Sequence, residues 1–415
     1  MARTVYLTCE LKSRDLDSRL LIAAHLLNAG LDVVVGQQWS MFENARVAPK
    51  GVFLFKTANR IQAHNMNFVR AKGHVAVAMD EEALAVSDAV ATKLSTDPDV
   101  FTTADAFLFQ NEQHRAMFER DGPLVGNARV DLLRTMRSLY EAEAAQCAAA
   151  GPYVLINTNY ALSNSVWGSS QHVRDIAMTT WQPDMTVPAV RDYMESWPAT
   201  EQRNFDAMIG FLRLLVPRLG GVRLVIRPHP AENRDMWRHV GGGAEIVVGS
   251  NPAPWIMGAA LTVHTNSTTG LEAALLECPC LNLNPDPQAT FSRSFVTNNA
   301  PFQASTPEDA FHAVRRALAG EAVPRDTDWI PHFPENAPGR VAAEIAARAI
   351  ESAPVTGWGR TSRQPVEIEK FSANLDDVSA RLLRMCSMLG ISNIVGGTLD
   401  DSIFWFGRGP SDAAP

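Results

Sequence analysis

Short apolar runs alternate with longer amphipathic stretches along the first part of the chain. The apolar runs are rich in Val, Leu and Phe and have the length of buried strands, and the stretches between them carry apolar residues at helical spacing. This alternation predicts parallel strands joined by right-handed helical crossovers, and so one doubly wound α/β domain over residues 1–150 that ends in a helix at 132–150. The predicted strands are residues 4–8, 31–36, 51–55, 74–79, 106–109 and 123–126.

A second series with the same periodicity follows the first. It predicts a second Rossmann-like domain over residues 151–335, with a cleft where the two domains face each other. Residues 336–415 are predicted to add helices at 339–352 and 374–389, and the last dozen residues, rich in Gly, Ser, Asp and Pro, a loose tail. The predicted strands of the second domain are residues 152–159, 222–227, 244–250, 260–265 and 280–284.

The 415 residues include 37 Lys and Arg against 45 Asp and Glu, a formal net charge of −8. A broad basic surface that binds nucleic acid is therefore not expected, and any anion site has to be local. No signal peptide is visible, no apolar stretch reaches the ~18 residues of a membrane span, and the five cysteines lack metal-binding spacing. We predict a cytoplasmic protein. A weak peripheral membrane contact through the C-terminal helices stays open, and the sequence says nothing of oligomeric state.

Parallel sheets bind ligands beyond the carboxyl ends of their strands, so polar residues at these junctions are the candidates for chemistry. Directly after the apolar run at 222–226 come Arg227 and His229, with a proline after each of them. Prolines restrict the backbone, so the guanidinium and the imidazole could form a preorganised anion grip. The same residues also suit an ordinary turn.

The junction after the strand at 260–265 holds Ser267, Thr268 and Thr269 at the start of a predicted helix. Hydroxyls beside the N–H groups of a helix N-terminus suit a phosphate, and Gly270 would let a ligand approach the backbone. Alternatively, Thr269 and Glu272 fit a capping box, which needs no ligand. In the first interpretation Glu272 closes the cap or reaches a ribose hydroxyl.

Three adjacent carboxylates, Asp80, Glu81 and Glu82, follow the strand at 74–79. Mutual repulsion at this position can raise the pKa of one carboxyl enough for general-base catalysis. A solvated helix N-terminus would use the same residues. The sequence leaves both interpretations open.

Two further junctions carry polar residues. Asn157 and Asn159 leave the first strand of the second domain, where amides suit a sugar or a base but also make ordinary turns. Glu10, Lys12 and Arg14 follow the first strand of the chain and either face the cleft or belong to the surface.

The commonest signatures of dinucleotide, P-loop, zinc-protease and α/β-hydrolase sites are absent from the sequence. The one D-x-D pattern, at Asp15 and Asp17, opens the first predicted helix, where a helix-start role is sufficient. No metal and no cofactor are required by the residues that remain.

Several segments together resemble the bacterial surface-carbohydrate biosynthesis proteins, which are relatives of capsule-type glycosyltransferases. The resemblance runs over roughly residues 4–350 and keeps the order of the family's motifs. Its segments are YLTCELKSRDLDSRLLIAAHL, APKGVFLFK, AMDEEAL, VGNARVDLL, VLINTNYALSN, RPHP and HTNSTTGLEAALL.

This resemblance implies a GT-B glycosyltransferase, metal-independent, that transfers an acidic sugar such as Kdo or a nonulosonic acid from a CMP-sugar to a glycan acceptor. Glycerophosphotransferases that use CDP-glycerol look similar in the second half. A nucleotide-sugar epimerase, and a non-catalytic scaffold for polysaccharide synthesis or export, are the remaining alternatives.

The resemblance also implies roles for individual residues. The acidic motif of similar sialyltransferases usually reads acid, acid, Gly, whereas this chain continues with Glu82 and Ala83, so the choice of catalytic carboxylate stays open between Asp80 and Glu81. That carboxylate would either deprotonate the acceptor or attack the sugar. The other implied roles are donor phosphate binding by Arg227, His229, Ser267 and Thr268, the donor side by Asn157 and Asn159, and the acceptor side by Glu10, Lys12 and Arg14.

Overall fold

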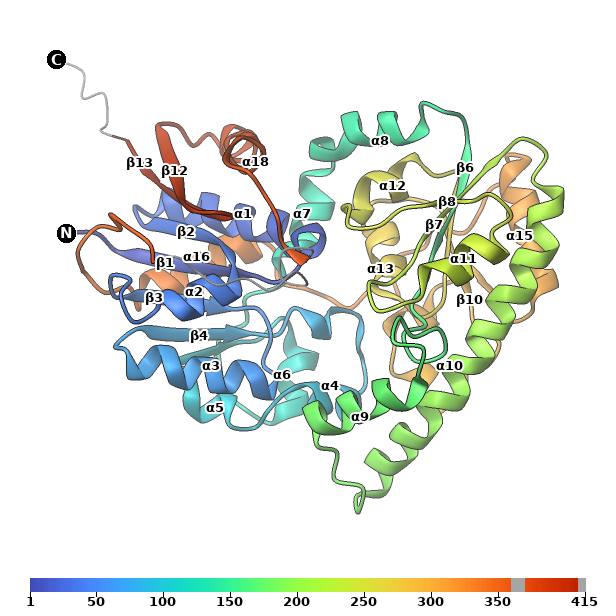
Figure 1. The fold of residues 1–415 in the computed structure, drawn as a ribbon, viewed down its shortest axis with the longest axis horizontal. Helices are drawn as coiled ribbons and strands as arrows, with labels where there is room; N and C mark the ends of the chain where they lie inside the picture. The colour runs from blue at the N-terminus through green and yellow to red at the C-terminus, as the bar shows by residue number, and fades with distance from the viewer. Residues whose placement is uncertain (360–369, 410–415) are drawn as a thin grey trace. The chain divides into compact units, whose positions relative to one another are not determined.

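The computed structural model describes residues 1–359 and 370–409 (Figure 1). The contacts within the chain divide it into two compact units, and each unit contains one sheet. Unit 1 consists of Met1–Leu84, Ser95–Leu139 and the chain from Phe333 onward, and unit 2 of Ala85–Leu94 and Tyr140–His332.

The sheet of unit 1 follows the order β12-β13-β2-β1-β3-β4-β5. Its strands from β2 to β5 are parallel, as the alternating pattern predicts, and each is buried on both faces. The strands are β1 (Thr4–Cys9), β2 (Asp32–Gln37), β3 (Gly51–Phe55), β4 (Val75–Met79), β5 (Ala106–Leu108), β12 (Ile394–Asp400) and β13 (Ile403–Arg408).

Helices cover this sheet. α1 packs against α7, α16 and α18, which come from three distant parts of the sequence. A cluster of aromatic and aliphatic residues that includes Tyr6, Phe53 and Phe55 packs on the sheet together with residues of α2 and α3. The helices are α1 (Lys12–Asn28), α2 (Gln38–Asn44), α3 (Arg60–Ala71), α5 (Val100–Thr103), α6 (Glu112–Phe118), α7 (Ala128–Thr135), α16 (Ala337–Ala346) and α18 (Leu375–Met388).

The end of the chain differs from the predicted loose tail. β12 and β13 form an antiparallel hairpin, and β13 pairs antiparallel with β2 at the edge of the sheet. The side chains of Ile403, Phe404 and Phe406 are buried there, which supplies the apolar contact that holds the hairpin. Residues 336–359 and 370–409 therefore belong to unit 1, while the last part of the predicted tail, residues 410–415, lies outside the described residues.

The sheet of unit 2 follows the order β11-β10-β9-β6-β7-β8, and all of its pairings are parallel. The central strands β6, β7 and β9 were predicted, whereas the predicted strand at 244–250 is reduced to β8. The strands are β6 (Tyr153–Asn157), β7 (Arg223–Arg227), β8 (Glu245–Ile246), β9 (Leu261–His264), β10 (Cys280–Leu283) and β11 (Gln303–Ala304).

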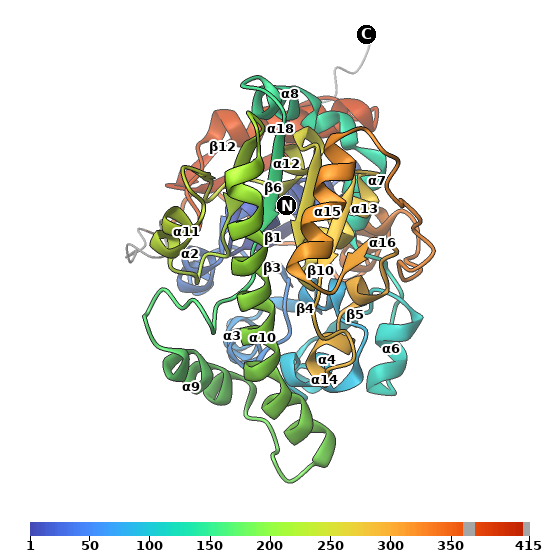
Figure 2. The same ribbon diagram turned by 90° about the vertical axis from the view of Figure 1, so that its right-hand side faces the viewer.

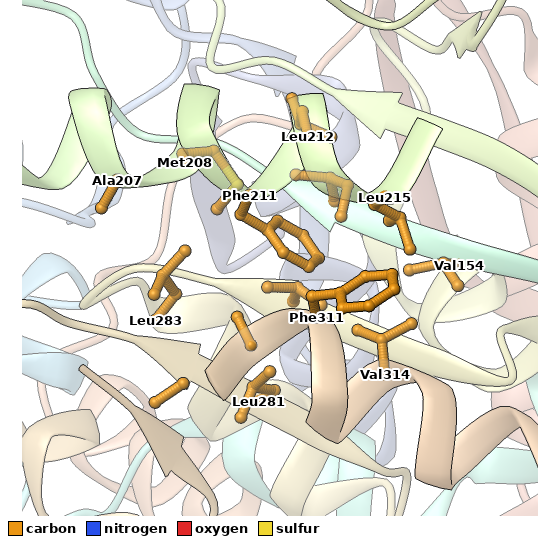
Figure 3. Packing of buried hydrophobic residues seen from close by; sticks show 14 of the residues in the cluster. Val154, Ala207, Met208, Phe211, Leu212, Leu215, Leu281, Leu283, Phe311 and Val314 are labelled. Carbon is orange, nitrogen blue, oxygen red and sulfur yellow. The ribbon is translucent and has the colours of Figure 1, made fainter. Parts of the chain in front are cut away.

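The long helix α10 lies beside α15 on one face of this sheet (Figure 2). Between them, Phe211 and Leu212 of α10 and Phe311 of α15 meet Val154 and Leu281 from the strands (Figure 3). The helices of unit 2 are α4 (Ala89–Ser95, whose last residue falls in unit 1), α8 (Glu141–Ala148), α9 (Ser170–Trp181), α10 (Pro188–Leu215), α11 (Arg234–Val240), α12 (Pro252–Gly258), α13 (Thr268–Leu275), α14 (Thr290–Arg293) and α15 (Pro307–Leu318).

The boundaries of the units differ from the predicted ones, and unit 2 ends at His332 instead of residue 335. Residues 85–94 belong to unit 2, because Ala91 and its apolar neighbours pack with Tyr193 and Trp197. The helix predicted at 132–150 is broken into α7, a 3₁₀ turn (Arg137–Tyr140) and α8, and the unit boundary falls within that turn.

The predicted strand at 123–126 is only a single bridge between Phe109 and Leu124.

No helix in the part of the chain that the structure describes is both long and apolar enough to cross a membrane. The predicted peripheral contact of the C-terminal helices stays a prediction.

Candidate functional site

The carboxyl ends of β7, β6 and β9 are neighbours in the sheet of unit 2. Arg227 and Asn157 are the last residues of β7 and β6, and they are paired in register. His264 is the last residue of β9 and leads into the turn before α13. The RPHP segment and the hydroxyl-rich segment therefore leave the same edge of one sheet.

Asn157 connects these two segments directly. Its amide oxygen accepts a hydrogen bond from Nη1 of Arg227 at 3.4 Å, and its Nδ2 donates to Oγ1 of Thr269 at 3.1 Å. Arg227 also donates through Nη2 to the carbonyl of Ser250. Since Asn157 is only 4% exposed, it is a buried bridge between the guanidinium and the first turn of α13.

The N-terminus of α13 is capped by Ser267, whose hydroxyl accepts from the N–H of Thr269 at 3.3 Å. The predicted capping box of Thr269 and Glu272 is therefore wrong: Thr269 is already inside the helix, and Glu272 is buried farther along it. Thr268 is exposed and Ser267 is half-buried. These two hydroxyls and the positive end of the helix dipole are the groups that this turn presents.

Gly270 serves packing in this structure. A Cβ atom at this position would lie 2.3 Å from Nε2 of His264, so the imidazole occupies the space that the sequence suggested for a ligand. His264 is 1% exposed, and its Nδ1 accepts from the N–H of Ser267 at 3.3 Å. Burial lowers the pKa of His264 to about 3, so the ring is neutral at neutral pH.

We expect Gly270→Ala to lower the free energy of unfolding by about 1–3 kcal/mol. The added methyl overlaps the imidazole of His264, and the hydrogen bond from the N–H of Ser267 holds that ring in place. Urea denaturation measures the loss. Gly357→Ala is the control, since nothing lies within 4 Å of a Cβ at that exposed position. An equal effect of both substitutions would contradict the packing role of Gly270.

A buried carboxylate, Glu232, organises the turn after β7. Its Oε1 accepts from the N–H of His229 at 3.0 Å and of Tyr160 at 3.1 Å, and its Oε2 accepts from Nε1 of Trp237 at 2.8 Å. The hydroxyl of Thr158 lies 2.9 Å from both oxygens. Burial raises the pKa of Glu232 to about 7, although these donors lower it.

His229 and Asn159 are both exposed, unlike the buried bridge Asn157. The ring of His229 accepts from the N–H of Ala231 through Nδ1 at 3.2 Å, so a neutral ring carries its proton on Nε2. Of the predicted donor residues, the structure thus places Asn159, His229 and Thr268 at the surface. Asn157 is buried and Arg227 is half-buried, and the two are hydrogen-bonded to each other at the ends of β6 and β7.

In unit 1, charged residues gather at the carboxyl ends of β1 and β3. Nζ of Lys56, directly after β3, lies 3.0 Å from Asp15 and 3.2 Å from Glu10. Arg14 lies 3.2 Å from Asp15 and 2.9 Å from Glu82. The side chains of Lys56 and Asp15 are only 2% and 3% exposed, so this ion pair is withdrawn from water.

The cations in this cluster lower the pKa values of its carboxyl groups. Burial by itself raises the pKa of Asp15, but Lys56, Arg14 and two backbone N–H donors more than offset it, and the pKa lies well below its usual range. The pKa of Glu10 is also lowered, because Lys56, Lys370 and Arg14 outweigh its burial. Asp15 accepts from the N–H groups of Glu10 and Leu11, which confirms its predicted place at the start of α1.

The acid run after β4 separates into different environments. Asp80 is 1% exposed, and burial together with the charge of Glu82 raises its pKa to about 7. Its carboxylate accepts from the N–H of Glu82 at 3.1 Å and from the hydroxyl of Thr96 at 3.4 Å. Glu81 instead pairs with the fully buried Arg19 at 3.3 Å. Asp80 therefore titrates near neutral pH, and Glu81 is held by a structural cation.

Three important residues were missed in the sequence. Lys56 stands directly after an apolar strand, and Glu232 follows His229 by three residues, so both positions carried a signal: a charge at the carboxyl end of a strand. Arg19 lies inside the first amphipathic helix among apolar residues, and no local pattern reveals that it is buried against Glu81. Lys12 has its predicted position at the start of α1 and is half-buried.

In the described ranges, 1–359 and 370–409, no three His, Cys, Asp or Glu side chains are grouped so that they could hold a metal ion. The predicted metal independence stays a prediction.

No protein-family model matches the sequence, and no curated protein matches it. Among solved structures, UDP-GlcNAc 2-epimerase from Methanocaldococcus jannaschii is similar at 11% identity, covering 84% of this chain and all (100%) of that one, with a TM-score of 0.49. The wall teichoic acid polymerase TagF (10% identity, 83% and 88% coverage, TM-score 0.45) and Acinetobacter baumannii MurG (13%, 83% and 99%, 0.40) are also similar. At these values the chemistry has to be argued from this chain's own residues.

Proposed function

We propose that the protein is a glycosyltransferase that moves an acidic sugar, Kdo or a nonulosonic acid, from a CMP-sugar to a surface glycan. The observation that carries the proposal is the bridge of Asn157 between Arg227 and Thr269. It brings a guanidinium and the N-terminus of α13 to one edge of one sheet. A nucleotide phosphate is the ligand that these groups suit. The choice of CMP and of an acidic sugar rests on the resemblance of the sequence segments.

In this proposal unit 2 binds the donor. When CMP departs, negative charge develops on its phosphate, and His229, Arg227 and the α13 N-terminus with Ser267 and Thr268 stabilise it. Asn159 contacts the sugar or the nucleoside from its exposed position beside the same edge.

Unit 1 supplies the acceptor side, through Glu10, Lys12 and Arg14, and the base. Asp80 is the proposed base because a carboxyl with a pKa near 7 can take up the proton of an acceptor hydroxyl at neutral pH. Glu81 is less suited, since its carboxylate is engaged by Arg19.

The donor is tested by incubating the protein separately with CMP-Kdo, a CMP-nonulosonate, CDP-glycerol and UDP-N-acetylglucosamine and measuring the released nucleotide. We expect release of CMP from one of the two CMP-sugars. Turnover of CDP-glycerol alone would replace the proposal by a glycerophosphotransferase. Conversion of UDP-N-acetylglucosamine to its epimer, observed by NMR because no nucleotide is released, would replace it by an epimerase. No turnover and no calorimetric affinity for CMP would favour the scaffold.

We expect His229→Ala to reduce CMP release by about 10²–10³-fold, the usual cost of removing one donor from a developing anion. The melting temperature should stay near that of the parent protein, because His229 is exposed. His239→Ala, which removes an exposed histidine of α11, is the matched control. Equal activity of the two variants would remove His229 from the donor site.

A further inference from the structure

The turn after β6 is held by two buried glutamates of similar design. Oε1 of Glu232 accepts backbone N–H groups, and its Oε2 accepts the indole N–H of Trp237. In the same way, Oε1 of Glu201 on α10 accepts the N–H groups of Leu162 and Ser163, and its Oε2 accepts the indole N–H of Trp197 at 2.8 Å. The two carboxylates therefore fix successive parts of one loop, residues 158–163.

Only one of these glutamates reaches the turn after β7. The donors to Glu232 come from the β6 loop, at Thr158 and Tyr160, and from the RPHP segment, at the N–H of His229. The hydrogen bonds of Glu201 to the loop fall at Leu162 and Ser163. Glu232 is fully buried at 0% exposure, so its hydrogen bonds do not compete with water.

The bonds of Glu232 fall next to the exposed candidate residues. It accepts the N–H of His229 itself and the N–H of Tyr160, the residue that follows Asn159. His229 and Asn159 are both exposed, so the buried carboxylate holds the backbone N–H of His229 and of the residue after Asn159 while these two side chains lie at the surface.

We infer that Glu232 is a positioning residue that sets His229 and Asn159 in one fixed arrangement for the nucleotide donor. This inference rests on the proposed function, because it assumes that the donor binds at this edge. Binding groups that are already held in place lose less entropy when a ligand binds. Glu232 therefore raises the affinity for the nucleotide sugar without contacting it. None of the four groups that donate to Glu232 is a cation, and so it is the geometry of its oxygens, rather than an ion pair, that holds the two loops.

Other bonds keep the loops folded without Glu232. The N–H of Val166 donates to the carbonyl of Ala231 at 2.8 Å, and the N–H of Asn233 donates to the carbonyl of Asn164 at 2.8 Å. Nδ2 of Asn164 adds a bond to the carbonyl of Asn233. Substitution of Glu232 should therefore loosen the two residues that face the ligand and leave this backbone pairing in place.

The test compares Glu232→Gln with Glu201→Gln. The new amide puts an N–H donor where an oxygen accepts the indole N–H, so in each variant two donors face each other and the side chain shifts. For Glu232→Gln we expect the amides of His229 and Tyr160 to exchange hydrogen about tenfold faster in the absence of any ligand. For Glu201→Gln the faster amides should be those of Leu162 and Ser163.

The second readout uses CMP and the CMP-sugar that the donor assay selects. Glu232→Gln should weaken the calorimetric affinity for CMP about tenfold and lower kcat/KM for the CMP-sugar by at least as much, because a displaced His229 also stabilises the departing phosphate less. Glu201→Gln should leave both quantities at the parent value. Since both variants remove one acceptor from a buried indole, a loss caused by stability alone would appear in both.

The outcomes test the positioning role of Glu232 and the proposed donor site separately. If the exchange of the His229 and Tyr160 amides is unchanged in Glu232→Gln, the positioning role is wrong. If their exchange accelerates but CMP affinity does not change, His229 and Asn159 do not bind the nucleotide donor. The proposed donor site is then wrong, although Glu232 still fixes the backbone of the two loops. Should Glu232→Gln fail to fold, the isosteric Thr158→Val removes one hydrogen-bond donor from the same carboxylate, and a smaller change in the exchange of the same amides and in kcat/KM is expected.

Discussion

Asp80→Asn is expected to slow sugar transfer by about 10²–10⁴-fold, the contribution of one general base, and to make the protein more stable at pH 8. The amide cannot take up the proton of the acceptor hydroxyl. It can still accept from the N–H of Glu82, and it removes a carboxyl that is 1% exposed. Activity and stability should therefore change in opposite directions.

The pH dependence follows from the raised pKa. Asp80 holds its proton in the folded state up to about pH 7, whereas the unfolded chain releases it near 3.8. Because the folded state binds more protons in this window, the stability contributed by Asp80 is complete below pH 3.8 and is lost as the pH rises to 7. The rise from 3.8 to about 7 corresponds to at most about 4 kcal/mol.

Urea denaturation of the parent and of Asp80→Asn from pH 4 to pH 8 measures this difference. The two free energies should lie closest at pH 4 and separate toward pH 7, with the variant more stable. Comparing the two proteins also cancels the contribution of Glu232, whose pKa is raised to about 7 as well. A constant difference over this range would contradict the burial effect.

Two matched variants locate the base. Glu81→Gln should lower the free energy of unfolding, because Arg19 loses the charge of its partner. Glu82→Gln should lower the free energy of unfolding less, because the Glu82 side chain is 44% exposed. If Glu82→Gln, and not Asp80→Asn, abolishes transfer, the exposed carboxylate is the base.

The strands and their order along the chain could be predicted because buried parallel strands are local signals: short apolar runs between amphipathic helices. The junctions could be predicted for the same reason. Asn157, Arg227 and Ser267 follow such runs, and parallel strands bring their carboxyl ends to one edge.

The C-terminal hairpin and the place of residues 85–94 in unit 2 could not be predicted from such local signals. β13 pairs with β2 across some 370 residues of chain, and Ala91 finds its apolar partners in Tyr193 and Trp197. Which distant segment covers an edge or a face depends on the assembled sheets, and the composition of the last residues resembles that of a tail.

The buried charges were missed for a related reason. A charged residue is normally expected at the surface, and its burial becomes possible only when partners arrive from elsewhere. Lys56 receives Asp15 and Glu10 from the β1–α1 turn, and Glu232 receives donors from the loop after β6. Neither set of partners can be identified from the local sequence.

Lys56→Met tests the strongest of these arrangements and should lower the free energy of unfolding at pH 7 by about 3–5 kcal/mol. The substitution keeps the length of the side chain but leaves Asp15, whose side chain is 3% exposed, without the cation at 3.0 Å. Arg14 remains at 3.2 Å but is itself 40% exposed, so it compensates only in part.

Acid should diminish this loss. In the parent protein the lowered pKa of Asp15 contributes stability that is present above pH 3.8 and disappears as the pH falls through the folded value. Without Lys56 the carboxyl takes up a proton more readily, so the difference between the two proteins shrinks from pH 7 toward pH 4. Urea denaturation across this range measures it.

Lys93→Met, at an exposed position of α4, is the control and should change the free energy by no more than about 0.5 kcal/mol. Combining Lys56→Met with Asp15→Asn should recover part of the loss, because the amide oxygen still accepts from the N–H of Leu11 while no charge remains to be compensated. If Lys56→Met were as stable as Lys93→Met, the buried cation would contribute nothing to holding the β1–α1 turn against β3.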